Sequence, residues 1–276
     1  MDNATGYRVM DMRTEDILAR RTRRQRKAAI VAAALFGLVV WSVDVTVVQD
    51  TDWERIGSLG EVMEAAGQFA GIDFSLFPSL LGPTLETLLI ACLGTAMGAV
   101  LCVPATWFGA MNITPFAPIT YPIARLMMTL SRSVHEIVWA LFFVAVFGLG
   151  AMAGVFAIAM RSIGFIAKLS AEAIEDIDPG PVEAMRATGA NTFQVMLYAI
   201  MPQVLPQVIG TVIFEWEINI RRSAVLGLVG AGGLGLVFFR QMNTFNFHGV
   251  TSVIIAILAI IFLGEAISHA IRRRMI

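Results

Sequence analysis

Charged residues and cysteines are scarce in this sequence of 276 residues, and the usual catalytic motifs are missing from it. Charged side chains make up 15% of the chain and hydrophobic ones 57%, whereas soluble domains carry about 25% and about 45–50%. The two cysteines, Cys92 and Cys102, lie in an apolar stretch and offer neither a disulfide framework nor a CxxC metal pair. G-x4-G-K-[ST] is absent, so this chain does not bind ATP through a P-loop. H-E-x-x-H and G-x-S-x-G are absent too, which argues against the catalytic sites that these motifs form.

What the chain has instead is apolar surface, which predicts an all-α integral membrane protein. A water-soluble fold cannot hide this much apolar surface, so the excess must face lipid. In one apolar run, Ala91, Gly94 and Gly98 have the spacing of a close helix contact. Six runs are long enough to span a bilayer as helices, and they cover residues 28–48, 84–108, 119–147, 151–167, 204–228 and 250–271.

The distribution of charge predicts which side of the membrane each segment faces. Residues 1–27 carry eight basic side chains and residues 272–274 are all arginine, whereas residues 49–77 contain six acidic side chains and one basic one. Because cytoplasmic segments are rich in lysine and arginine, both termini and the polar loop 168–202 are predicted to be cytoplasmic. A signal peptide is the alternative for the basic start, but no A-x-A cleavage site follows the first run. We therefore expect a basic cytoplasmic segment followed by a transmembrane domain, 28–276.

The polar loop 168–202 contains a motif with a known counterpart. Its residues are Glu183, Ala184, Met185, Arg186, Gly189 and Pro202. They resemble the EAA motif of ABC importer permeases, with Met185 in place of the second alanine. The resemblance implies that a short helix docks on an ATP-binding cassette subunit, which binds ATP and magnesium, so no cofactor is expected on this chain. The alternative is an interfacial helix that only joins two spans.

The stretch from Arg132 to Gly235 is more specifically similar to the permease subunit of phosphonate ABC importers. The matching strings cover residues 133–140, 171–184 and 225–233. This resemblance implies the type I importer transmembrane fold with six spans, a location in the bacterial inner membrane, and transport of a phosphonate or a related oxyanion such as phosphate or phosphite.

The same resemblance implies a set of partners. These are a second copy of the chain, two ATPase subunits, an extracytoplasmic substrate-binding protein and membrane lipid, with no role for nucleic acid. A permease for another small solute and a non-ABC transporter or channel are the alternatives. A membrane enzyme is a third, which the missing nucleophile, metal and cofactor motifs argue against.

The fifth apolar run is unusual because polar and charged residues interrupt it. Within eight positions it contains Glu215, Glu217, Asn219, Arg221 and Arg222. Charges at membrane depth cost about 2.5–3.5 kcal/mol each on insertion scales, so these side chains are expected to face protein or water. Guanidinium is the natural partner of a phosphorus oxyanion. The last four residues are therefore candidates for the substrate pathway, with Arg221 favoured.

Helix geometry places Arg221 about 29 Å along the fifth span from Pro202, toward the outer end. Two alternatives remain open, because Glu217 and Arg221 at positions i and i+4 could pair only with each other, or the arginines could reach the outer headgroups. His135 and Glu136 in the third run are further pathway candidates, with a hydrogen-bonded helix contact as the alternative. Their spacing does not make a metal pair, and no metal site is expected.

A glycine-rich segment follows the fifth run. Gly230, Gly232 and Gly235 formally satisfy G-x-G-x-x-G, with Gly233 between them. A dinucleotide-binding loop needs a preceding strand and an acidic residue about 20 positions later, whereas here a membrane span precedes the glycines and no acidic residue follows until Glu265. Because glycine permits tight turns and close backbone approach, these residues are predicted to form an outward gate loop or a re-entrant segment.

Overall fold

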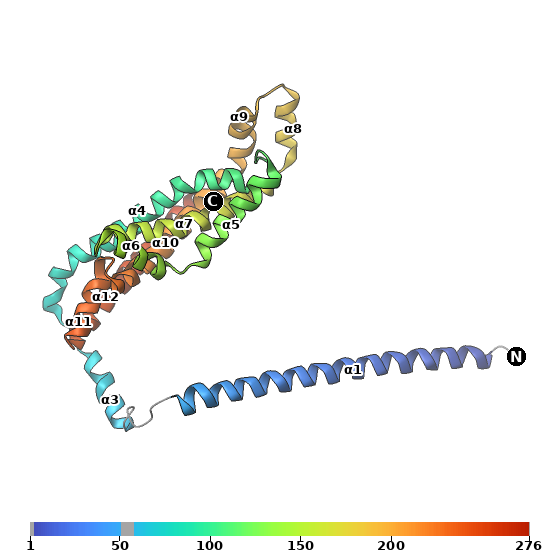
Figure 1. Ribbon diagram of the computed structural model, residues 1–276, viewed down its shortest axis with the longest axis horizontal. Helices are drawn as coiled ribbons and strands as arrows, with labels where there is room; N and C mark the ends of the chain where they lie inside the picture. The colour runs from blue at the N-terminus through green and yellow to red at the C-terminus, as the bar shows by residue number, and fades with distance from the viewer. Residues whose placement is uncertain (1–2, 51–57, 276) are drawn as a thin grey trace. The chain divides into compact units, whose positions relative to one another are not determined.

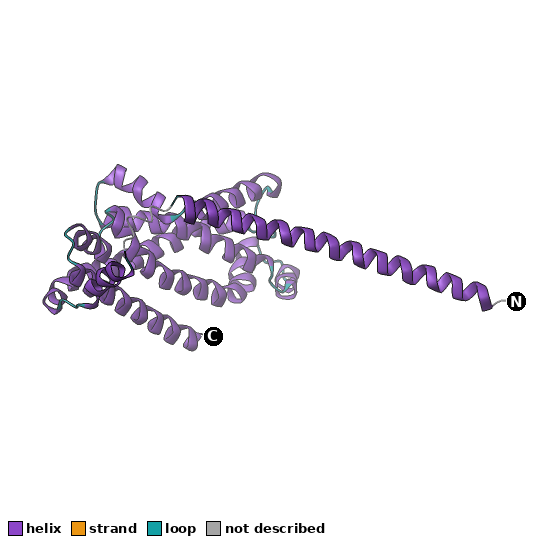
Figure 2. Cartoon of the chain, turned by 90° about the horizontal axis from the view of Figure 1, so that it is seen from below, coloured by secondary structure: helices purple, strands orange, loops and turns teal. Residues whose placement is uncertain are grey.

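The computed structural model describes residues 3–50 and 58–275, and in these ranges the chain is helical, with no strand (Figure 2). Two compact units, Met1–Ala65 and Ala66–Ile276, are considered separately. Residues 51–57 of the predicted acidic loop, residues 1–2 of the basic segment and the side chains of its residues 3–20 lie outside the described part.

The first unit contains a long helix, α1, Asn3–Val43, which continues as a π-helical segment, Asp44–Gln49. A second helix, α3, Leu59–Gly67, begins in this unit. The predicted first span lies in α1 and the π-helical segment. Its large apolar side chains are exposed, for example 70% of Phe36 and 66% of Trp41. A helix with apolar side chains exposed all round is suited to lipid, and the stretch is long enough to cross a bilayer.

The second unit is a helical bundle with α7 at its centre (Figure 1). Its helices are α4, Phe77–Gly109; α5, Ala117–Ser133; α6, Glu136–Phe147; α7, Ala151–Glu175; α8, Pro179–Ala187; α9, Thr192–Val195; α10, Met201–Leu226; α11, Gly233–Asn243; and α12, Phe247–Met275. Helix α7 packs against α4, α5, α6 and α10, while α12 packs against α10, α11 and α4. Three apolar clusters fill the spaces between these helices.

The contact between α4 and α7 depends on small residues, as the sequence predicted. A Cβ atom added at Gly94 would lie 2.7 Å from Ile158 Cγ2, and one added at Gly98 would lie 2.7 Å from Ser162 Cβ. Real Cβ atoms essentially never come this close to another heavy atom. Glycine therefore allows the two helices to approach each other closely, and Ala91, on the same helix, is fully buried.

The third predicted span, 119–147, is not one helix. It is divided into α5 and α6, which are bent by 89° at Val134 and His135. Both residues have extended backbone conformations, and the His135 Nδ1 atom accepts a hydrogen bond from the Ile137 N–H as the N-cap of α6. This cap starts a new helix in the middle of an apolar run, and hydropathy alone cannot reveal it.

Two other helices exceed their predicted bounds. Helix α7 continues to Glu175 rather than ending near residue 167, because Ala171, Ala173 and Ile174 of its continuation pack into the core. Helix α4 begins at Phe77, seven residues before the predicted start. Within the described residues, five helices are long and apolar enough to cross a membrane, or six when α5 and α6 count as one span.

Candidate functional site

A buried polar network lies on one face of α10. Glu215, Asn219 and Arg222 are spaced so that they share this face. Arg222 Nη1 donates to Glu215 Oε1 at 2.7 Å and to Asn219 Oδ1 at 2.9 Å. Asn219 Nδ2 in turn donates to Thr95 Oγ1 on α4 and to Ser162 Oγ on α7, both at 2.9 Å. Glu215 and Asn219 are fully buried, so the network links three helices in the interior of the bundle.

Glu136 connects this network to α6. Its Oε1 atom lies 3.5 Å from Arg222 Nε and its Oε2 atom lies 3.3 Å from Arg161 Nε. Arg161, on α7, also donates from Nη1 to the Arg132 carbonyl at 3.2 Å, across the break between α5 and α6. Two arginines and two carboxylates thus come together, with neighbouring charges of opposite sign. The sequence had selected Arg222, Asn219 and Glu136, and the structure brings these three together.

Sequence reasoning missed Arg161, Ser162 and Thr95 as members of the network. Arg161 was the available signal, because it is a charge inside the apolar run that forms α7. The hydroxyls of Thr95 and Ser162 gave no comparable signal, since such side chains usually bond to their own helix. Thr95 does so here, donating to the Ala91 carbonyl while it accepts from Asn219.

The other two charges of α10 face a different helix. Glu217 Oε1 accepts from Arg221 Nη2 at 2.8 Å, and Glu217 Oε2 accepts from Arg272 Nη2 of α12 at 2.8 Å. The pairing of Glu217 with Arg221, held open as an alternative, is therefore present. Arg221 therefore lies at the level of Arg272, near the end of α12. Its position toward the outer end of the span stays a prediction.

His135 lies at the edge of the network. Its Nε2 atom is 3.8 Å from Glu136 Oε1, and its side chain is 63% exposed. Its other nitrogen caps α6. The predicted hydrogen-bonded helix contact is thus found for His135, while Glu136 points inward to the arginines. No group of three or more possible metal ligands occurs among the described residues.

The glycine-rich segment is a packed turn between α10 and α11. Gly230, Gly232 and Gly233 have φ angles of 87°, 84° and 69°, which residues other than glycine rarely adopt. The Gly230 carbonyl accepts from the Gly150 N–H at 2.9 Å, and Thr87 Oγ1 accepts from the Leu234 N–H at 2.8 Å. A Cβ at Gly235 would collide with the Ala224 carbonyl. Close approach to α4 and α7 explains Gly232 and Gly233, and close approach to α10 explains Gly235. Their role as a gate stays a prediction.

The EAA-like residues lie on a helix that projects from the bundle. Figure 1 shows α8 and α9 beyond the ends of the long helices of the second unit. In α8, Glu183, Ala184 and Arg186 are exposed and Met185 is half-buried. Asp178 caps this helix by accepting from the Gly180 N–H at 2.9 Å. Two short helices had been predicted on either side of residues 178–181, but the first is the end of α7 and this segment begins the second.

Gly189 and Pro202 have local structural roles at the two ends of the connection to α10. Gly189 has a φ of +82° and nothing within 4 Å of an added Cβ. The positive φ angle is therefore the reason for a glycine at this position. Close packing within the chain is not the reason, because a side chain would have room. Pro202 lies in the first turn of α10, directly after a π-helical segment, Met196–Ile200. Proline is tolerated there because the first turn of a helix leaves backbone N–H groups unpaired.

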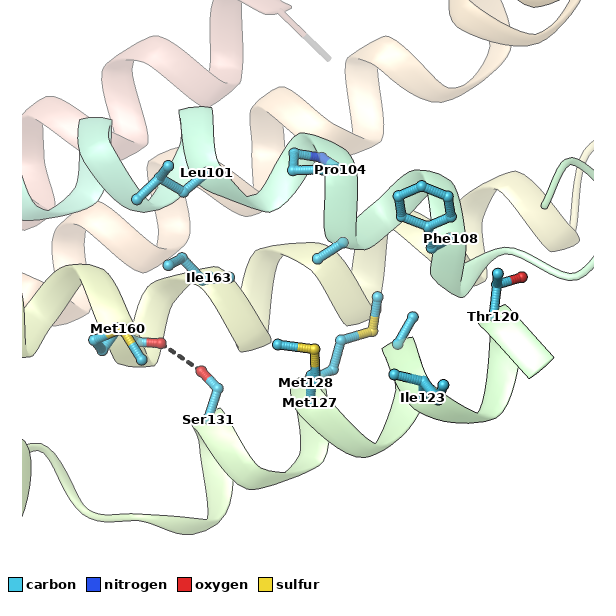
Figure 3. Close-up of a pocket in the computed structure, with 12 residues that line it drawn as sticks. Leu101, Pro104, Phe108, Thr120, Ile123, Met127, Met128, Ser131, Met160 and Ile163 are labelled. Carbon is cyan, nitrogen blue, oxygen red and sulfur yellow. Dashed lines mark hydrogen bonds between the residues drawn. The ribbon is translucent and has the colours of Figure 1, made fainter. Parts of the chain in front are cut away.

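A cavity of about 550 Å³ lies between α4, α5 and α7 (Figure 3). Its walls include Leu101, Phe108 and Met127, and no charged side chain lines it. The Ser131 hydroxyl donates to the Met160 carbonyl at its edge. An apolar cavity without cationic groups is unsuited to an anion, so we place the candidate transport site at the charged network.

Comparisons with known proteins agree with this architecture. Residues 99–276 match the family described as binding-protein-dependent transport system inner membrane component. The phosphite transport system permease protein of Stutzerimonas stutzeri is 37% identical over 79% of this chain and 79% of that protein. The phosphate-import permease protein of Mycolicibacterium smegmatis is 39% identical over 69% of this chain and 36% of that protein.

Solved structures show the same fold. A methionine ABC transporter in an inward-facing conformation has a TM-score of 0.65 at 23% identity, over 74% of this chain and all of that chain. At this identity the likeness shows the fold alone, which is that of type I ABC importer permeases, as the sequence predicted. The chain therefore belongs to the family of binding-protein-dependent transport system inner membrane components: it is a multi-pass permease subunit, with an ATPase and a substrate-binding protein as separate partners.

Proposed function

We propose that two copies of this chain form the membrane pathway of an ATP-driven importer for a small phosphorus oxyanion. One observation carries the proposal, namely that the guanidinium groups of Arg161 and Arg222 meet at Glu136 inside the bundle. Guanidinium groups bind phosphorus oxyanions through charge-assisted hydrogen bonds. The relatives named as phosphite and phosphate permeases support phosphite, phosphate or a phosphonate as the substrate.

The proposal assigns coupling to α8. Its exposed Glu183, Ala184 and Arg186 would contact an ATPase subunit, on which ATP and magnesium bind. The chain termini and residues 168–202 then lie in the cytoplasm, and the turn that contains Gly230 and Gly232 lies toward the outer side, where it gates entry. The basic ends of the chain support this orientation.

Uptake into proteoliposomes tests the substrate class. The complete complex, with ATPase subunits and binding protein, is reconstituted, and ATP-dependent uptake of labelled phosphate, phosphite and methylphosphonate is measured in turn, with sulfate and methionine as competitors. At least one of the three phosphorus oxyanions should be taken up, and neither sulfate nor methionine should compete with it. Uptake of none of the three, or competition by methionine, would reject the proposal.

Glu183→Lys tests the coupling assignment. Reversal of this exposed charge should reduce co-purification of the ATPase subunit, while the permease still inserts into the membrane. Glu64→Lys is a suitable comparison, because Glu64 is equally exposed but lies on α3, outside α8. Equal amounts of ATPase subunit in the Glu183→Lys and unsubstituted complexes would show that α8 does not dock through this residue.

A further inference from the structure

Glu136 differs from the other buried carboxylates of the bundle in how it contacts its arginines. Its oxygens lie 3.3 Å from Arg161 Nε and 3.5 Å from Arg222 Nε. Glu215 and Glu217, in contrast, accept from their arginines at 2.7 and 2.8 Å. Charge-assisted hydrogen bonds are typically about 2.7–2.9 Å long. Glu136 thus lies between two guanidinium groups without a full hydrogen bond to either of them.

Two buried polar atoms without partners also lie at this point. Glu136 Oε2 and Arg161 Nε are buried, and neither has a hydrogen-bond partner among the described residues. Glu136 is only 9% exposed. A buried polar atom without a partner is destabilising, and a native structure usually has a reason for one. A tetrahedral oxyanion between the two arginines could provide an acceptor with better geometry for Arg161 Nε.

The position of Glu136 allows its carboxylate to leave. It is the first residue of α6, directly after the bend of 89° that separates α6 from α5. Helix α6 packs mainly against α7, and Glu136 links it to α10 through its contact with Arg222. Next to Glu136, His135 is 63% exposed, so the network reaches the surface of the chain on this side.

The charges of the network favour an anion once Glu136 has moved. Glu136 and Glu215 balance Arg161 and Arg222, because two carboxylates face two guanidinium groups. Removal of the Glu136 carboxylate leaves one positive charge in excess, distributed over two guanidinium groups. A phosphorus oxyanion carries several oxygens that can accept from both groups at once.

We propose that Glu136 is a tethered competitor of the transported anion, which occupies the place between Arg161 and Arg222 when no substrate is there. The incoming oxyanion displaces the carboxylate, and the returning carboxylate helps to release the oxyanion. Glu136 therefore sets the affinity of the pathway for its substrate. This inference rests on the proposed function, since it assumes that the network lies in the pathway of an oxyanion.

Direct binding to the full-length chain in lipid nanodiscs tests this idea, because a binding protein would otherwise dominate the apparent affinity for uptake. Isothermal titration calorimetry is carried out with methylphosphonate, phosphite, phosphate and sulfate. Glu136→Gln keeps the shape of the side chain and removes its charge, so it should bind the phosphorus oxyanions about tenfold more tightly, which corresponds to about 1.4 kcal/mol. In the complete complex, the same variant should turn over more slowly, because release lacks its competitor.

Matched variants separate competition from damage to the fold. Glu175→Gln also removes a carboxylate that pairs with an arginine of a neighbouring helix, Arg125 at 2.7 Å, but at a distance from the network. It should leave anion affinity unchanged. Glu136→Asp retains the charge and should bind anions no more tightly than the unsubstituted chain. Glu136→Gln with Arg222→Gln should lose the gain in affinity.

The outcomes distinguish this inference from the proposed function. If the unsubstituted complex transports phosphorus oxyanions but Glu136→Gln and Glu136→Asp have the same anion affinity, the competitor role is wrong and the function stands. If Glu136→Gln binds these anions more tightly but the unsubstituted complex transports none of them, the proposed function is wrong. A gain in affinity in Glu175→Gln of the same size would also overturn the inference.

Discussion

At the scale of single residues, the partner of each arginine on α10 determines its role. Arg222 is 13% exposed and contacts two carboxylates and an amide in the interior. Arg221 is 44% exposed and contacts Glu217, which keeps a second bond to Arg272. The two arginines are neighbours in the chain, but they point about 100° apart on the helix. They should therefore respond differently to substitution.

Replacement of Arg222 by Gln should damage the protein more than replacement of Arg221. Without Arg222, the fully buried Glu215 carboxylate loses its cation, and breaking a buried ion pair on one side costs about 3–5 kcal/mol. Without Arg221, Glu217 still accepts from Arg272. In thermal unfolding of the purified permease, the melting temperature should therefore fall strongly for Arg222→Gln and only slightly for Arg221→Gln.

Glu215→Gln combined with Arg222→Gln is the control for that comparison. The double variant leaves no uncompensated charge, so it should regain stability over Arg222→Gln alone. Uptake of phosphate by the double variant should remain low, because the guanidinium is still missing. Full recovery of uptake would mean that Arg222 only neutralises Glu215.

Helix contact through glycine gives a second prediction at this scale. Gly98→Leu places a side chain where a Cβ already lies 2.7 Å from Ser162, and overpacking of this kind typically costs about 1–3 kcal/mol. Gly82→Leu on the same helix meets nothing within 4 Å. The melting temperature in detergent should fall for Gly98→Leu and stay within error for Gly82→Leu. Equal melting temperatures would contradict the close contact between α4 and α7.

The sequence revealed which residues of the site are unusual but could not reveal their partners. Charges inside an apolar run are visible without a structure, and Glu217 with Arg221 follows from helix spacing. The contacts of Arg222 with Glu136 and of Glu217 with Arg272 join residues more than 50 positions apart. Only the packing of α6 and α12 against α10 brings them together, so no local pattern encodes them.

At the scale of elements, hydropathy located the apolar helices but did not predict their lengths or ends. Caps and packing determine these ends: His135 begins α6 inside an apolar run, and Ala171 and Ile174 pack into the core where α7 extends beyond one. The link between α8 and α10 is similar, since Gly189 reverses the chain and a π-helical segment precedes Pro202. Each of these features involves only a few residues, and it contributes little free energy compared with the burial of an apolar span.

The conformation of Gly189 leads to a prediction that separates two reasons for a glycine. Asn tolerates a positive φ far better than Leu does. If backbone conformation is what matters, Gly189→Asn should retain the ATPase subunit and Gly189→Leu should lose it, as judged by co-purification. If close approach of the partner is what matters, both variants should lose the subunit, because either side chain would fill the space next to α8.

At the scale of the whole molecule, composition and charge were enough to predict the class of fold. An apolar excess that no soluble core can hide requires membrane spans, and lipid requires that each span be a helix whose backbone is internally bonded. Composition does not determine the number of spans. That number depends on whether α5 and α6, bent by 89°, together cross the membrane or return to the side from which they came.

The two ends of the bent pair lie at opposite ends of α7, which argues for a crossing. The segment before α5 is held at the C-terminal end of α7, because the Met111 N–H donates to Glu175 Oε1 at 2.9 Å and Asn112 Nδ2 donates to the Ile174 carbonyl at 2.6 Å. Helix α6 ends at Phe147, only four residues before α7 begins at Ala151. With 25 residues, α7 is about 37 Å long, more than the hydrocarbon core of about 30 Å.

Labelling of single cysteines in sealed cells tests this crossing. In a background without Cys92 and Cys102, Phe116→Cys precedes α5 and Leu149→Cys follows α6, and both native side chains are exposed, 82% and 78%. If the pair crosses, a membrane-impermeant maleimide added outside should label Leu149→Cys and miss Phe116→Cys until the cells are opened. Gln68→Cys should behave like Leu149→Cys, and Arg186→Cys like Phe116→Cys, because α8 follows the C-terminal end of α7. Equal labelling of Phe116→Cys and Leu149→Cys in sealed cells would mean that the pair is re-entrant, so that five spans separate the two termini to opposite sides and the shared cytoplasmic location of both basic ends is wrong.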